Sequence, residues 1–223
     1  MLGNASSGEN RLAKWIDHVF DHPVAAKGWY FGEDAPEWEG RAEETARFIA
    51  ECFEESGKLL ARFDDGQLDQ GFWYLVSASG SDFMEALVDV EVDLGLRIRA
   101  LRSFVPVFEQ VIAARCSPHL SHLDEQVANA LNSACYMWWD IAPLRPAPGE
   151  SQRVKFDREA LGVMERILAI RHDACRESAL HGLGHWSVYP EAQRIIDDFL
   201  AREKGLRPEV VAYAVAARKG MVL

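Results

Sequence analysis

The sequence predicts an all-α protein, in which stacked antiparallel helix pairs form either an α-solenoid or an irregular array of about nine or ten helices. Apolar residues recur at intervals of three and four along most of the chain, and the strict alternation typical of strands is nearly absent. Prolines and glycines gather between the periodic segments, where helices are expected to end. The chain has 223 residues, 48% of them hydrophobic and 26% charged, which suits one domain with a sizeable core.

The opening residues predict a loose tail ahead of the first helix. Residues 1–10 are polar and rich in glycine, asparagine and serine, so we expect them to be flexible. The remaining residues, 11–223, are expected to form a single all-helical domain. Its first helix should lie within 9–22, where the apolar residues from Leu12 to Val19 keep helical spacing.

Residues 24–40 predict a long loop after the first helix, because glycine, proline and acidic residues dominate this segment. The loop nevertheless carries four aromatic side chains, Trp29, Tyr30, Phe31 and Trp38. Long loops in compact proteins are often functional. Trp29, Tyr30 and Trp38 are therefore candidate partner-contact residues. The alternative is that these rings only hold the loop against the helices.

The middle of the chain predicts several further helices. Residues 94–113 give the clearest pattern, and Pro106 should disturb that helix because proline lacks a backbone N–H. An aspartate at the start of a helix can serve as its N-cap. The expected helices are 41–63 with a break at Gly57, one that begins near Asp64 or Asp65, a short one from Ser81, and 94–113.

The C-terminal half predicts helices with clearer boundaries. Residues 143–153, "PLRPAPGESQR", contain three prolines and predict a loop. Proline is favoured in the first turn of a helix, which marks two of the starts. The expected helices are 126–142, 157–171, 174–186, one from Pro190 and one from Pro208.

The segment "CRESALHGLGHWSVYPEAQRIIDDFL", from Cys175, resembles one unit of the HEAT-like helical repeats. In that family a helix with an Ala-Leu-x-x-Leu-Gly core is followed by a short turn and a second amphipathic helix. The matching residues are Ala179, Leu180, Leu183 and Gly184. The resemblance implies a right-handed stack of helix pairs with one concave face. "ALNSACYMWWDI" and "ACRESALHGLGHW" also resemble segments of uncharacterised bacterial proteins, and that likeness implies no activity.

The charge of the chain limits its expected partners. The net charge is −11, and residues 1–70 hold 15 acidic against 7 basic side chains. A negative surface repels phosphate groups, so we expect no nucleic-acid partner and favour a basic protein. No apolar run reaches the length of a membrane span, and no signal peptide is visible, so we expect no membrane partner and a cytoplasmic location. The four cysteines should then be free thiols.

Histidines occur in close pairs that could bind a metal. His181 and His185 lie four residues apart, on one helix stripe with Glu177, and His119 and His122 form a second pair. Imidazole and carboxylate ligands suit zinc or iron. The HExxH string is missing, however, and glycines between the histidines indicate close helix packing instead. We therefore expect no metal or cofactor. If zinc or iron does bind, the candidate ligands are Glu177, His181, His185, His119 and His122.

The functional prediction is a non-enzymatic protein-binding module of the adaptor or immunity type, which presents a concave helical surface. The expected contact residues are Trp29, Tyr30, Trp38, Trp138 and Trp139. The alternative is a metal-dependent all-helical enzyme that uses the histidine and glutamate ligands. A third hypothesis is a structural subunit that forms a homo-oligomer through its aromatic residues.

Overall fold

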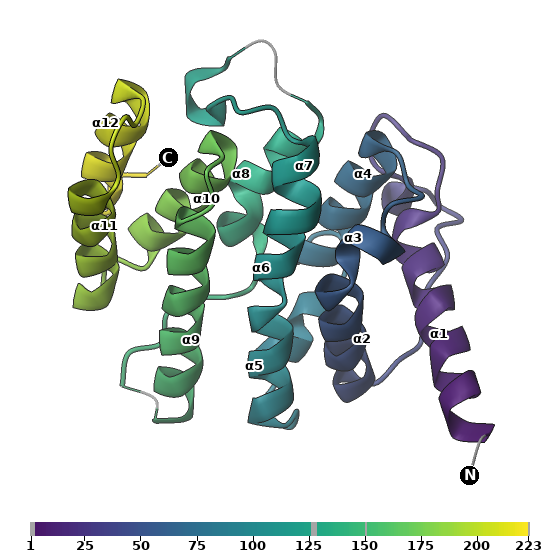
Figure 1. The fold of residues 1–223 in the computed structure, drawn as a ribbon. Helices are drawn as coiled ribbons and strands as arrows, with labels where there is room; N and C mark the ends of the chain where they lie inside the picture. The colour runs from purple at the N-terminus through teal and green to yellow at the C-terminus, as the bar shows by residue number, and fades with distance from the viewer. Residues whose placement is uncertain (1–2, 126–128, 150, 223) are drawn as a thin grey trace.

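The computed structural model describes residues 3–125, 129–149 and 151–222. Over these ranges the chain forms nine α-helices of seven or more residues and no strand, which confirms the predicted all-α array. The main helices pack in two layers, and α1 and α12 lie at opposite ends of the array (Figure 1). One layer contains α2 (Ala42–Glu54), α5 (Leu94–Arg102), α9 (Ser151–Leu168) and α11 (Pro190–Arg202). The other contains α1 (Gly3–Phe20), α4 (Asp65–Val76), α8 (Leu131–Ile141), α10 (Asp173–His185) and α12 (Pro208–Ala217).

Short elements connect these helices. They are η1 (Trp29–Phe31), α3 (Ser56–Leu59), η2 (Phe83–Leu87), α6 (Phe104–Val107), the π-helical η3 (Phe108–Ile112), α7 (Ala113–Arg115) and η4 (Ser121–Leu123). The predicted helix 94–113 corresponds to α5 through η3, interrupted at Ser103. Pro106 has no N–H to donate to the carbonyl oxygen of Arg102, so the interruption lies where the missing hydrogen bond predicts it.

Local chemistry sets several helix boundaries. The Asp64 carboxylate accepts a hydrogen bond of 2.8 Å from the Gln67 N–H, and the Gln67 side chain accepts one of 3.2 Å from the Asp64 N–H. This capping box starts α4 at the predicted place. Pro190 and Pro208 occupy the first turns of α11 and α12, as expected. One break differs from the prediction, because α2 ends at Glu54, ahead of the glycine at position 57.

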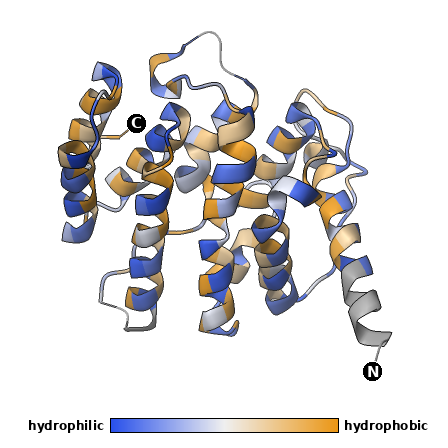
Figure 2. Ribbon diagram, in the orientation of Figure 1, coloured by the Kyte–Doolittle hydropathy of each residue, from blue (hydrophilic) through white to orange (hydrophobic). Residues whose placement is uncertain are grey.

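Hydrophobic faces account for the remaining helix positions. Helix α9 begins at Ser151, inside the predicted loop 143–153, and the fully buried Phe156 extends its apolar face toward the N-terminus. Helix α1 begins at Gly3 and so includes part of the predicted tail, whose mobility stays a prediction. Figure 2 shows hydrophobic and hydrophilic residues interspersed along most helices, as in amphipathic packing. No helix in the described ranges is both long enough and apolar enough to cross a membrane.

Trp138 on α8 lies at the centre of the core. Its side chain is fully buried, and its ring centroid lies 5.2 to 6.1 Å from four phenylalanine rings that come from both layers. These are Phe53, Phe72, Phe104 and Phe108. Trp139 is fully buried as well. The prediction that Trp138 and Trp139 contact a partner is therefore wrong, because both rings fill space inside the helical array.

Helix α10 packs closely against its neighbours through its glycines. A Cβ atom on Gly182 would lie 2.6 Å from Cγ of Trp139, and one on Gly184 would lie 2.6 Å from a methyl carbon of Val222. Side chains cannot approach so closely, so both positions require glycine in this arrangement. This confirms the packing role predicted for these glycines. Helices α8, α9, α11 and α12 all contact α10, and every residue from 174 to 184 is buried.

Candidate functional site

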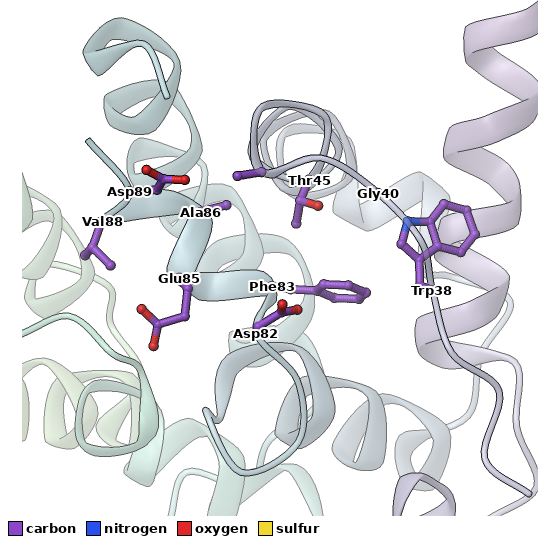
Figure 3. Close-up of a pocket in the computed structure, with 10 residues that line it drawn as sticks. Trp38, Gly40, Thr45, Asp82, Phe83, Glu85, Ala86, Val88 and Asp89 are labelled. Carbon is purple, nitrogen blue, oxygen red and sulfur yellow. The ribbon is translucent and has the colours of Figure 1, made fainter. Parts of the chain in front are cut away.

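The predicted loop and the η2 segment form a groove beside α2. Trp38 of the loop lies across one pocket from Glu85 and Asp89, with Thr45 of α2 between them (Figure 3). This pocket has a volume of about 430 Å³, and an adjoining one of about 440 Å³ shares Trp38, Asp82 and Phe83 with it. We call the two together the acidic groove. Its aromatic residues are Trp29, Tyr30, Trp38, Tyr74 and Phe83, and its acidic residues are Glu33, Glu37, Asp82, Glu85 and Asp89.

Ring contacts with α1 and α4 hold the aromatic side of the groove. The imidazole of His22 stacks on Trp29, with centroids 3.6 Å apart and planes 13° apart. Trp29 packs against Tyr74, whose hydroxyl lies 2.9 Å from Nε2 of His18. Trp29 and Trp38 are half-buried, as is Tyr30 between them. The rings therefore attach the loop to the helices and also line the groove, so the two roles considered for them are compatible.

The groove has a strongly negative lining. Asp82 and Glu85 are exposed, as are Glu33 and Glu37 on the loop. No lysine or arginine is found among the described residues that line either pocket. Burial raises the pKa of Tyr74 to about 12, and the nearby Asp82 carboxylate adds to this shift. A cationic group in the groove would thus meet ring faces and carboxylates together.

Trp38 already contacts a cation within the chain. The Arg11 guanidinium lies 5.1 Å from the centroid of the Trp38 ring. The same guanidinium donates two hydrogen bonds, of 2.6 and 2.8 Å, to the Glu44 carboxylate. An aromatic face and a carboxylate thus hold one guanidinium beside the acidic groove, which is the usual geometry of cation recognition.

The candidate metal ligands separate into different places. Glu177 of α10 is buried, and its carboxylate accepts hydrogen bonds of 2.8 and 3.0 Å from the backbone N–H groups of Ser121 and His122. Its Oε1 also lies 2.6 Å from Nδ1 of His122. Glu177 thereby holds η4 against α10. Glu177 and His181 are both buried, because neighbouring helices enclose α10.

His181 and His185 meet a carboxylate that the sequence does not indicate. Their Nε2 atoms lie 3.0 Å apart, and Oδ1 of Asp140 lies 3.4 Å from Nε2 of His185. Burial lowers the pKa of His181 to about 4, and the neighbouring His185 contributes further. His119 gives no donor atom to this group. Asp140 is the residue after Trp139, which packs on Gly182 of α10. This contact between α8 and α10 is what places the Asp140 carboxylate beside the two histidines, and the sequence alone does not show it.

Comparison of the chain with protein-family models, with curated proteins and with solved structures finds no match. The likeness to HEAT-like repeats therefore rests on the segment that begins at Cys175, and what the structure supports is an all-helical fold. The structural features that bear on the function of this chain are the side chains of the acidic groove and of α10.

Proposed function

We propose that this chain is a non-enzymatic protein-binding module that takes a basic segment of a partner protein in the acidic groove. The observation that supports this most strongly is the composition of the lining, in which five aromatic rings and five carboxylates share two adjoining pockets. Ring faces attract ammonium and guanidinium groups, and carboxylates accept charge-assisted hydrogen bonds from them.

The size of the groove suits one or two long basic side chains at a time. Each pocket, at about 430 and 440 Å³, falls in the range of pockets that hold small ligands. We infer that an arginine or lysine enters beside Trp38 and Phe83, while its charged end reaches Asp82 or Glu85. The excess of acidic residues within 1–70 would draw a basic partner toward this end of the molecule.

The proposal also covers the architecture and the setting of the module. Successive long helices alternate between the two layers, as they do in helical-repeat proteins. This alternation supports a HEAT-like stack with a concave face. An adaptor or immunity-type role is consistent with such a surface. The four cysteines are free and buried, which supports action in a reducing compartment such as the cytoplasm.

Fluorescence anisotropy with a labelled arginine- and lysine-rich octapeptide tests the proposal. The double variant Asp82→Asn, Glu85→Gln removes two carboxylates of the groove. It should weaken peptide binding about tenfold, the equivalent of about 1.4 kcal/mol. The matched control, Glu55→Gln with Asp198→Asn, removes the same charge from exposed positions outside the groove and should change the affinity less than about twofold.

Two outcomes would contradict the proposal. One is equal weakening by the groove variant and by the control, which would mean that the peptide responds only to net charge. The other is binding of the basic peptide that is no tighter than binding of an uncharged peptide of the same length. Circular dichroism of all variants verifies that each keeps its helical content.

A further inference from the structure

The polar group formed by Asp140, His181 and His185 lies between α8 and α10, and none of its three residues lines the acidic groove. One potential donor atom from each of the three lies within 4.8 Å of the other two. His181 is fully buried, whereas the side chains of His185 and Asp140 are 33% and 38% exposed. The group therefore has a buried side and a side that solvent can reach.

Helix packing brings these three residues together. His181 and His185 are one helical turn apart, so their imidazoles project from the same face of α10. Gly182, between them, lets Trp139 of α8 lie directly against the α10 backbone. Asp140 is the next residue on α8 and reaches the histidines from there. Glycine at position 182 has a low helix propensity. It nevertheless allows α8 to approach α10 closely enough to bring the Asp140 carboxylate to the imidazoles of His181 and His185.

Two of the three donor distances match those around a tetrahedral metal ion, and the third, between His181 and Asp140, is within 4.8 Å. Zinc bonds of about 2.0 to 2.1 Å to nitrogen and oxygen place neighbouring donor atoms about 3.3 Å apart. The two Nε2 atoms are separated by 3.0 Å, and Nε2 of His185 lies 3.4 Å from Oδ1 of Asp140. The half-exposed Asp140 side chain can adjust its position by rotation. A direct hydrogen bond between the two imidazoles is the competing explanation of the 3.0 Å distance.

An outer layer of side chains orients the buried imidazole. Nδ1 of His181 lies 2.8 Å from the Tyr213 hydroxyl, which donates in turn to the Tyr136 hydroxyl at 3.4 Å. The Tyr213 oxygen therefore accepts from Nδ1–H of His181, and the Nε2 lone pair is left facing His185. The ring of His122 stacks on Tyr213, with centroids 4.2 Å apart, and fixes the phenol in place. Metal-bound histidines usually have such a partner on the second nitrogen.

We propose that Asp140, His181 and His185 bind a divalent transition metal, with zinc as the best-matching ion. Two neutral imidazole nitrogens and one carboxylate oxygen form a ligand set known for zinc sites with an open coordination position. The fourth position would face solvent between His185 and Asp140 and would hold water. The site involves none of the acidic groove residues, so it stands whether or not a basic peptide binds there.

The test is a zinc titration of the full chain, purified without an affinity tag and stripped with a chelator. Competition with a chromophoric zinc chelator should give one tight site per chain. His185→Gln and Asp140→Asn, each at a partly exposed position, should weaken zinc binding at least about tenfold. Tyr213→Phe keeps the ring but removes the hydroxyl, and should weaken binding by about tenfold to a hundredfold through His181.

The matched control is His22→Gln, in the other pair of histidines spaced by four residues. Nε2 of His22 lies 2.8 Å from the carbonyl oxygen of His18, and His22 belongs to no group of three potential metal donors in the described part of the chain, so this variant should bind zinc like the wild type. The proposal is overturned if the wild type, after it has been titrated with zinc and then desalted, retains less than about 0.2 zinc per chain. It is also overturned if His185→Gln and Asp140→Asn bind zinc as tightly as the wild type. Circular dichroism of each apoprotein establishes that the variants are folded.

Discussion

Replacing Gly182 with alanine adds a single methyl group at the closest approach of α8 and α10. The new Cβ would lie 2.6 and 2.9 Å from Cγ and Cδ1 of Trp139, and 3.1 Å from the sulfur of Met164. The indole is fully buried and packs against Phe104 with a centroid distance of 5.9 Å, so it cannot move aside without disturbing the core. The helices must therefore separate to accept the methyl group.

The net effect follows from two opposing contributions. Alanine is favoured over glycine inside a helix by about 1 kcal/mol. Overpacking a core position costs about 1 to 3 kcal/mol, and the contact with a rigid ring places Gly182 at the upper end of that range. We expect Gly182→Ala to lower the free energy of unfolding by about 2 kcal/mol, and the melting temperature by about 4 to 8 °C for a chain of this size.

Gly162 on α9 provides the matched control, because a Cβ at that position would have no neighbour within 4 Å. Gly162→Ala should therefore raise the free energy of unfolding by up to about 1 kcal/mol. Urea denaturation followed by circular dichroism measures both variants. If Gly182→Ala proved as stable as Gly162→Ala, the close approach of α8 and α10 inferred from the glycine contacts would be refuted.

Three further predictions concern the groove, the histidines and the thiols. Trp38→Leu should weaken peptide binding by about fivefold to thirtyfold because it removes a ring face, and unchanged anisotropy titrations would contradict this. Burial is the main cause that lowers the pKa values of His18 and His181 to about 4 in the folded chain. In the unfolded chain the pKa of each histidine has its ordinary value of about 6.5, so at pH values below about 6.5 the unfolded chain binds more protons than the folded chain. Stability should therefore fall as the pH decreases from about 6.5 to about 4, and a urea midpoint that stays constant over this range would count against it. Hydrogen bonding with Cys135 and His172 lowers the pKa of the Cys175 thiol, yet the residue is fully buried. Iodoacetamide should thus label Cys175 slowly in the native protein and rapidly in urea, as mass spectrometry can measure, and fast native labelling would refute its burial.

Helix boundaries could be predicted wherever the deciding interaction is local. The Asp64 capping box involves residues three apart, and Pro190 and Pro208 act within their own first turns. The same holds for the interruption before Pro106, which depends on one missing N–H. Each of these signals is complete within a few residues, so the sequence is sufficient to place it.

The burial of particular residues could not be predicted in the same way. Helical periodicity gives the direction of a side chain around its own helix, but it does not give the number of helices that surround it. Trp138 and Trp139 point in different directions from α8, and both are buried because neighbours cover both directions. Likewise, Glu177 and His181 lie opposite the apolar face of α10 and are still enclosed.

Both sites depend on residues that are distant in the sequence. The loop residue Trp38 was a candidate, but Asp82 and Phe83 on the other side of the groove carry no motif. Asp140 joins His181 and His185 only through the packing of α8 on α10. These pairings arise from tertiary structure, and a single sequence contains no local pattern that reports them.

The most direct test of the groove proposal is an NMR titration that follows the seven tryptophan indole N–H signals of the ¹⁵N-labelled chain while the basic octapeptide is added. Binding in the acidic groove predicts shifts for Trp29 and Trp38 that saturate together, and unchanged signals for the buried Trp15, Trp138, Trp139 and Trp186. Saturable binding that leaves both Trp29 and Trp38 unshifted would contradict the proposed site.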